Sequence, residues 1–183
     1  MILSGSAIQR AVAAGEICVD PFDPALTNPN SHNYRLGPRL RVMADDVADP
    51  TRSPALTEFT VSEVDGHVLE PGRVYLGTTA ERIGSTHYVP SLIGRSSLGR
   101  LGVFLQVSAD LGQLGAVHHW TLEIVVTQPV RVYAGMVVGQ VSFWRPVGGR
   151  MPYEGHYGTR SDPAPWNPAV ASGFPEHGER KKR

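Results

Sequence analysis

Several features that mark other classes of protein are scarce in this sequence. Its 183 residues contain a single cysteine, Cys18, which excludes a disulfide framework and a multi-cysteine zinc site and suggests a buried structural thiol. The 17 Lys and Arg residues balance 17 Asp and Glu residues, so the chain lacks the basic field that selects nucleic acid or an anionic membrane. It shows neither a long uncharged apolar run nor a secretion signal. We therefore expect a soluble, cytoplasmic protein that binds no DNA, no RNA and no membrane.

Turn-forming residues are abundant instead, with 20 glycines and 15 prolines. This content is too high for a helical bundle and is typical of short strands joined by turns. One helix is predicted over residues 5–14, where Ser4 can cap the start and Gly15 the end. Residues 43–58 are predicted to form a surface loop. Strands are predicted over 34–42, 59–64, 74–78, 103–108, 120–127, 129–133 and 136–144. The expected organisation is one all-β domain over residues 1–151, followed by a C-terminal lid and flexible tail over residues 152–183.

The densest unusual segment is a glycine-framed turn over residues 94–102. It combines two guanidinium groups with two hydroxyls, from Arg95, Ser96, Ser97 and Arg100. Hydroxyl and backbone N–H groups can bind phosphate oxygens, arginine adds bidentate charge-assisted bonds, and a short helix beginning near Ser96 would direct its N-terminus at the anion. The segment predicts a phosphate-binding turn, with a capped helical turn bearing solvated arginines as the alternative.

A second candidate runs from His118 to Glu123, where two adjacent histidines precede a carboxylate. In a continuous strand His119, Thr121 and Glu123 share one face, whereas His118 points to the other. Adjacent histidines therefore disfavour a cupin-like metal site, whose two histidines lie two residues apart. Glu123 stands among apolar neighbours, so its carboxylate lies either on a wet face or buried with partners. It is a candidate general base.

The order and spacing of several short segments are specific when taken together. These segments are Met1-Ile2-Leu3-Ser4, Gly15-Glu16-Ile17, Asp20-Pro21-Phe22-Asp23-Pro24, Tyr34-Arg35-Leu36-Gly37, Leu69-Glu70-Pro71-Gly72, the turn 94–102, Leu122-Glu123, Gly135-Met136 and Gly139-Gln140. Over about residues 1–160, the chain resembles the dCTP deaminases of the dUTPase-like superfamily.

This resemblance implies a distorted β jelly roll that assembles as a homotrimer, with each active site shared between neighbouring chains. It implies that Arg95, Ser96, Ser97 and Arg100 hold the triphosphate of a pyrimidine deoxynucleotide. It assigns to Glu123 the task of driving water onto C4 of cytosine, without zinc. A Mg²⁺ ion is expected to accompany the triphosphate.

The resemblance also assigns residues to the base, the sugar and a lid. The base and sugar contacts fall on Ser108, Ala109 and Gln113, and the lid on Tyr153, His156, Tyr157 and Arg160. Some of these positions depart from the family pattern: Gln113 replaces an aspartate that helps bind sugar and water, while His156 and Arg160 replace a lysine and a glutamine of the lid. Asn33 replaces a further aspartate. The departures suggest altered specificity for the base or the phosphate number.

The resemblance predicts an enzyme that converts dCTP to dUTP and ammonia. Two alternatives stay open. One is a dUTPase-like or bifunctional deaminase and diphosphatase, which Gln113 disfavours because an amide cannot act as a base. The other is a nucleotide-binding regulatory module without turnover, which the altered lid favours and Glu123 disfavours.

Overall fold

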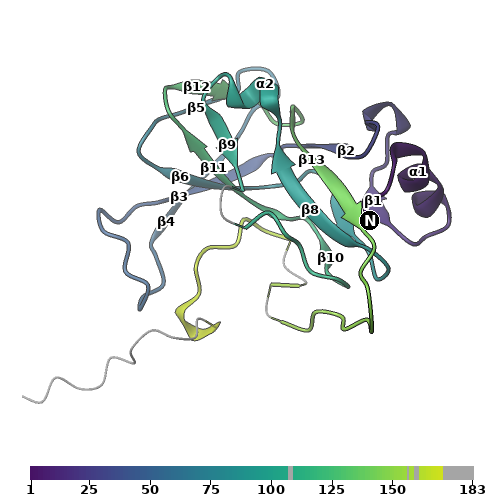
Figure 1. Cartoon of the computed structure of the whole chain (residues 1–183). Helices are drawn as coiled ribbons and strands as arrows, with labels where there is room; N and C mark the ends of the chain where they lie inside the picture. Colours follow the sequence, from purple (N-terminus) through teal and green to yellow (C-terminus); the bar gives the residue numbers. More distant parts are fainter. Residues whose placement is uncertain (107–108, 156, 159–160, 171–183) are drawn as a thin grey trace, which may run out of the picture.

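A computed structural model of the protein describes residues 1–106, 109–155, 157–158 and 161–170. Among these residues strands predominate and all strand pairs are antiparallel, which confirms the expected all-β class (Figure 1). The helical elements are α1 (Gly5–Ala13), α2 (Ser96–Gly99), η1 (Pro24–Leu26) and η2 (Pro168–Val170). The strands are β1 (Cys18–Asp20), β2 (His32–Arg35), β3 (Arg39–Met43), β4 (Leu56–Thr60), β5 (His67–Leu69), β6 (Val74–Thr78), β7 (Arg82–Gly84), β8 (Val89–Gly94), β9 (Val103–Leu105), β10 (Val117–His118), β11 (Thr121–Val126), β12 (Val130–Val132) and β13 (Val137–Trp144).

Helix α1 forms as its sequence predicts. The Ser4 side chain accepts a hydrogen bond from the Ala7 N–H at 3.4 Å and so caps the first turn. Ile8 and Ala11 are buried at helical spacing, and Gly15 follows the helix with a φ of +72°. Within the described part of the chain, no helix is long and apolar enough to cross a membrane.

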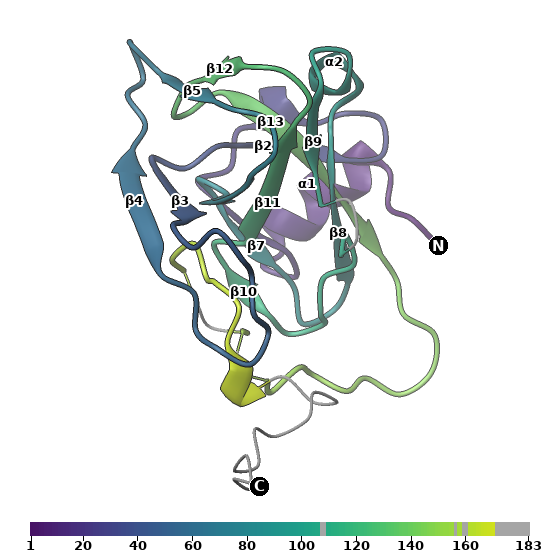
Figure 2. The same ribbon diagram turned by 90° about the vertical axis from the view of Figure 1, so that its left-hand side faces the viewer.

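Two larger sheets form most of the domain. One has the strand order β4-β3-β6-β11-β9, and the other has the order β2-β13-β8. Two smaller sheets, β1-β7-β10 and β12-β5, complete the structure (Figure 2). Side chains from both larger sheets meet in one hydrophobic core, which includes Tyr34, Leu122, Ile124 and Phe143.

Alternation along β11 determines where Glu123 points. Leu122, Ile124 and Val126 are buried in the core, whereas Thr121, Glu123 and Val125 are half-buried on the other face. Because successive side chains of a strand point to opposite faces, the apolar neighbours of Glu123 anchor the strand and leave its carboxylate outside the core.

Some predicted elements are wrong in their bounds. The predicted strand 34–42 is divided into β2 and β3, because the chain turns at Gly37 and Pro38. Strand β4 begins at Leu56, inside the predicted loop. Strand β8 was not predicted, because it contains Pro90, which is tolerated since β8 is an edge strand.

The single cysteine is less enclosed than the sequence suggested. Cys18 is half-buried on β1, and its Sγ lies 3.7 Å from the Arg82 carbonyl oxygen. Partial burial raises the pKa of this thiol above its ordinary value.

Candidate active site

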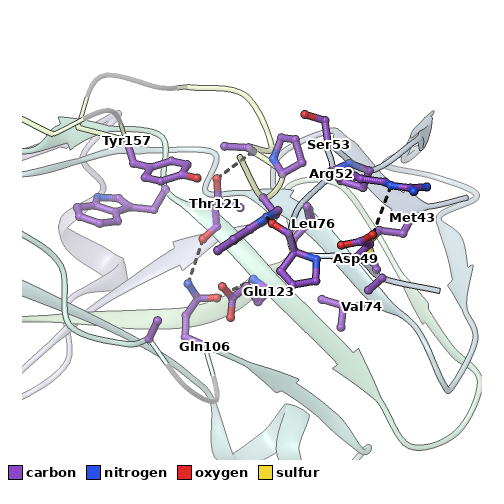
Figure 3. A pocket seen from close by; sticks show the side chains of 18 of the residues that line it. Met43, Asp49, Arg52, Ser53, Val74, Leu76, Gln106, Thr121, Glu123 and Tyr157 are labelled. Carbon is purple, nitrogen blue, oxygen red and sulfur yellow. Dashed lines mark hydrogen bonds and ion pairs between the residues drawn. The ribbon is translucent and has the colours of Figure 1, made fainter. Parts of the chain in front are cut away.

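A cavity of about 1220 Å³ opens beside β6 and β11. Its lining comes from the loop between β3 and β4, from β6, β10 and β11, and from the chain that follows β13 (Figure 3). Leu76 and Trp120 contribute apolar surface, and Thr121 and Glu123 contribute polar groups. The volume is sufficient for a nucleotide, since ligand pockets commonly range from about 300 to 1,000 Å³.

The predicted catalytic residue, Glu123, lines this cavity. It lies in the middle of β11, opposite Leu76 of β6, and its half-buried side chain lines the cavity. The sequence left two positions open for this carboxylate, either on a wet face or buried with partners. The structure places it on the wet face, which a water molecule and a substrate can reach.

Gln106 follows the end of β9 and holds the backbone around Glu123. Its side-chain Nε2 donates to the Thr121 carbonyl at 3.0 Å, and its Oε1 accepts from the Glu123 N–H at 2.7 Å. Its own N–H donates to the Glu123 carbonyl at 3.3 Å. Gln106 also lines the cavity and has a φ of +50°, in the left-handed region that residues other than glycine seldom adopt. Sequence reasoning missed this residue, because glutamine carries no turn signal.

The two histidines lie on the opposite sides from those that a continuous strand would give them. His118 is buried and lines the cavity with Thr121 and Glu123, whereas His119 lies near the carbonyl of Thr79, with Nδ1 at 3.1 Å. The prediction that His119 shares the face of Glu123 is wrong. The reason is a break between β10 and β11 at residues 119–120, where the Trp120 N–H donates to Thr79 Oγ1 instead of continuing a strand ladder.

The described residues include four other predicted site residues in the cavity: Ala109, Gln113, Tyr153 and Tyr157. Gln113 is exposed, so its amide is open to a ligand. Asp110, a nearby carboxylate in the chain, lies outside the cavity lining, and its Oδ2 accepts from Ser91 Oγ at 3.3 Å. Ser108, His156 and Arg160, like the last ten residues with their predicted disorder, lie outside the described residues.

The predicted phosphate-binding turn lies outside the cavity lining. A short helix begins at Ser96 as predicted, and buried Leu98 anchors it while Ser96, Ser97 and Arg100 are exposed. None of the four predicted phosphate ligands lines the cavity. Helix α2 and the chain segment after β13 that closes the cavity lie at opposite ends of the molecule in both views (Figures 1 and 2). A single chain therefore does not bring this turn to Glu123.

The charge of the cavity lining is consistent with a predicted phosphate-binding turn that lies outside the cavity. Its described lining includes four carboxylates, from Asp45, Asp46, Asp49 and Glu123, and one arginine, Arg52. Arg52 lies 3.4 Å from Asp49 in an ion pair. A triphosphate would meet net negative charge in this described part of the lining.

Residues 161–166, here named the C-terminal strap, lie beside the cavity, and Ala164, Pro165 and Trp166 line it. Arg41 Nη1 donates to Asp162 Oδ2 at 2.9 Å and to the Pro163 carbonyl at 2.8 Å. The Ala164 N–H donates to Thr121 Oγ1 at 3.1 Å, two residues from Glu123, and the Trp166 indole donates to the Pro50 carbonyl at 2.7 Å. The sequence predicts a C-terminal lid and flexible tail over residues 152–183 and marks Trp166 as a packing residue, and the structure shows the bond from this tryptophan to the loop between β3 and β4.

The described residues offer no group of three or more His, Cys, Asp and Glu side chains arranged to hold a metal ion. His118 and Glu123 both line the cavity, but they do not form part of such a cluster. In the described lining, the Glu123 carboxylate lies beside apolar and aromatic surface.

Comparison with known proteins identifies the family. A family model described as dCTP deaminase-like matches residues 2–146. The chain belongs to this family. The resemblance drawn from the sequence is confirmed, and with it the expected class of enzyme.

Individual relatives extend the comparison. A protein named "dCTP deaminase, dUMP-forming" from Clostridium acetobutylicum is 42% identical over 149 residues, which cover 81% of this chain and 84% of the relative. A "dCTP deaminase" from Rhodopirellula baltica is 41% identical over 154 residues, which cover 84% of this chain and 76% of the relative. The crystal structure of 2'-deoxycytidine 5'-triphosphate deaminase from Agrobacterium tumefaciens is similar with a TM-score of 0.62 and 26% identity. That match covers 78% of this chain, which spans 47% of the Agrobacterium chain.

Proposed function

We propose that this protein deaminates dCTP by hydrolysis and releases dUTP and ammonia. The observation that carries the proposal is the position of Glu123: in a chain of the dCTP deaminase-like family, its carboxylate lines a cavity large enough for a nucleotide. The proposed reaction needs no zinc, because Glu123 can supply both acid and base.

In the proposed reaction, the Glu123 carboxylate takes a proton from water as the water oxygen attacks C4 of cytosine. Glu123 passes this proton to N3, which completes a tetrahedral intermediate. It then takes the proton of the new hydroxyl group and gives it to the amino nitrogen. The C4–N bond breaks, ammonia leaves with the electron pair, and the C4 carbonyl forms. Proton transfer by a positioned side chain contributes about 10²- to 10⁴-fold in rate.

The triphosphate is proposed to bind Arg95, Ser96, Ser97 and Arg100 of a neighbouring chain. This arrangement accounts for two observations. The turn lies away from the cavity of the same chain, and the described lining of that cavity is acidic. Hydroxyls and guanidinium groups fit phosphate oxygens. Mg²⁺ is proposed to arrive with the substrate, held by phosphate oxygens, because the turn itself contains no carboxylate.

A homotrimer is the proposed assembly. Ile93, Leu101 and Phe104 are large apolar residues that stay exposed close to the phosphate-binding turn in sequence, at 42%, 52% and 43% of their surface. Exposed apolar surface of this kind marks contact surfaces between proteins. A neighbouring chain that covers these residues would bring the exposed Arg100 toward another chain's cavity.

The remaining predicted residues are proposed to bind the base and cover it. Backbone groups of Ser108 and Ala109 would bind the pyrimidine edge, and the Gln113 amide would contact the sugar. Tyr153 and Tyr157 offer aromatic surface in the cavity. His156 and Arg160 are proposed to complete the lid from the same stretch of chain.

A second candidate function is deamination with release of dUMP, and the comparisons favour this product, since most of the similar relatives are named dUMP-forming. Such an enzyme would also cleave the bond between the α- and β-phosphates. Gln113 opposes this candidate, since its amide cannot take a proton from water.

The test measures products from dCTP with Mg²⁺. Wild-type protein should release ammonia and dUTP. Pyrophosphate and dUMP would favour the second candidate, and binding without turnover would favour the regulatory module. Glu123→Gln should retain nucleotide affinity but lose about 100-fold or more in kcat, since the amide cannot take a proton. The matched control is Glu63→Gln, at an exposed position outside the cavity. A wild-type rate for Glu123→Gln would refute the assignment of the chemistry to this residue.

A further inference from the structure

The side chain of Gln106 occupies the place where a strand would otherwise continue. The β9–β11 ladder ends at the pair Leu105 and Ile124. Beyond this pair, β11 still presents the Thr121 carbonyl and the Glu123 N–H toward the missing strand. The Gln106 amide satisfies both groups, donating at 3.0 Å and accepting at 2.7 Å, as a peptide group of a neighbouring strand would (Figure 3).

The backbone of Gln106 makes this arrangement possible. Its φ of +50° lies in the left-handed region, and in this conformation its N–H donates to the Glu123 carbonyl at 3.3 Å. Glycine would adopt this conformation without steric penalty. A glutamine at a position that suits glycine implies that its side chain does something glycine cannot do, and two hydrogen bonds of that side chain go to the two peptide groups that precede Glu123, on either side of Leu122.

We propose that Gln106 is a positioning residue, which fixes the backbone of Glu123 so that its carboxylate points into the cavity at the angle the reaction requires. This inference rests on the proposed role of Glu123 as acid and base. The hydrogen-bonded N–H belongs to Glu123 itself, so a shift of this peptide group moves the carboxylate directly. Misplacement of a reacting group by about 1 Å can cost on the order of 100-fold in rate.

The test compares Gln106→Gly with Gln106→Ala. Both variants remove the amide, but glycine relieves the left-handed backbone whereas alanine retains it, so the glycine variant should have the higher Tm. If Gln106 positions Glu123, both variants should lose about 10- to 100-fold in kcat to a similar extent, with KM within about twofold of wild type. A merely structural role predicts that activity follows Tm, with the glycine variant close to wild type, and that result would overturn the proposal.

A third variant keeps the test decisive if the first two do not fold. Gln106→Met retains the length and bulk of the side chain without its hydrogen bonds, so a fall in its kcat at unchanged KM supports positioning and a wild-type kcat overturns it. Glu123→Gln is measured alongside. A fully active Glu123→Gln would refute the proposed function, whereas an inactive Glu123→Gln together with a fully active Gln106→Gly would refute the positioning role alone.

Discussion

His32 should make the folded protein sensitive to acid. Its side chain, on β2, is fully buried. Its ring stacks on Phe22 at 4.9 Å between centroids, and its Nδ1 lies 3.3 Å from Thr27 Oγ1. Its Nε2 has no hydrogen-bond partner among the described residues. Burial lowers the pKa of His32 from 6.5 to about 4, because the enclosed ring cannot be solvated once it is charged.

The expected cost follows from this pKa difference. Above pH 6.5 the histidine is neutral in both the folded and the unfolded chain and contributes no pH dependence. Between pH 6.5 and about 4 the unfolded chain binds the proton and the folded chain does not, so stability falls with falling pH. The difference of 2.5 between 6.5 and 4, at about 1.36 kcal/mol for each pKa unit, amounts to about 3.4 kcal/mol.

The assay is urea unfolding of wild type and His32→Phe at one fixed protein concentration, from about pH 8.5 to pH 4.5. Phenylalanine keeps a ring against Phe22 and cannot be protonated. Loss of the Thr27 contact should cost about 1 kcal/mol at every pH. Between about pH 7.5 and 4.5, the variant should gain about 2.5 kcal/mol relative to wild type. A stability difference that stays constant over this range would refute a buried neutral His32, and constancy above about pH 7.5 is the internal control.

Two further predictions concern the shared site and the strap. Equimolar Arg100→Ala and Glu123→Gln chains, unfolded and refolded together, should regain about a quarter of wild-type activity, the share of interfaces that pairs both intact residues. Activity no higher than that of the separate variants would contradict a shared site. Arg41→Ala should accelerate amide hydrogen exchange at Ala164 by about tenfold, because it removes the bond to Asp162, with Arg41→Lys intermediate. Unchanged exchange would show that Arg41 does not hold the strap.

Local sequence patterns were sufficient where neighbours in the chain decide the structure. The bounds of α1 depend on its cap and its buried face, and those of β6 on its turn residues, and both were predicted closely. Alternation alone placed Thr121 and Glu123 on one face of β11. The same rule was wrong for His118 and His119, because it assumes a continuous strand, and the break between β10 and β11 arises from a hydrogen bond to Thr79 of a distant strand end.

The sequence by itself determined the family, the all-β class and Glu123 as the candidate acid and base, because these depend on residue types in a fixed order. Only the tertiary structure showed that the predicted phosphate-binding turn lies outside the cavity lining, that Gln106 bonds to the N–H of Glu123, and that the C-terminal strap packs beside the cavity. Each of these depends on contacts between residues far apart in the chain. Such contacts leave no periodicity in the sequence, since they are set by how the sheets and connections pack in three dimensions.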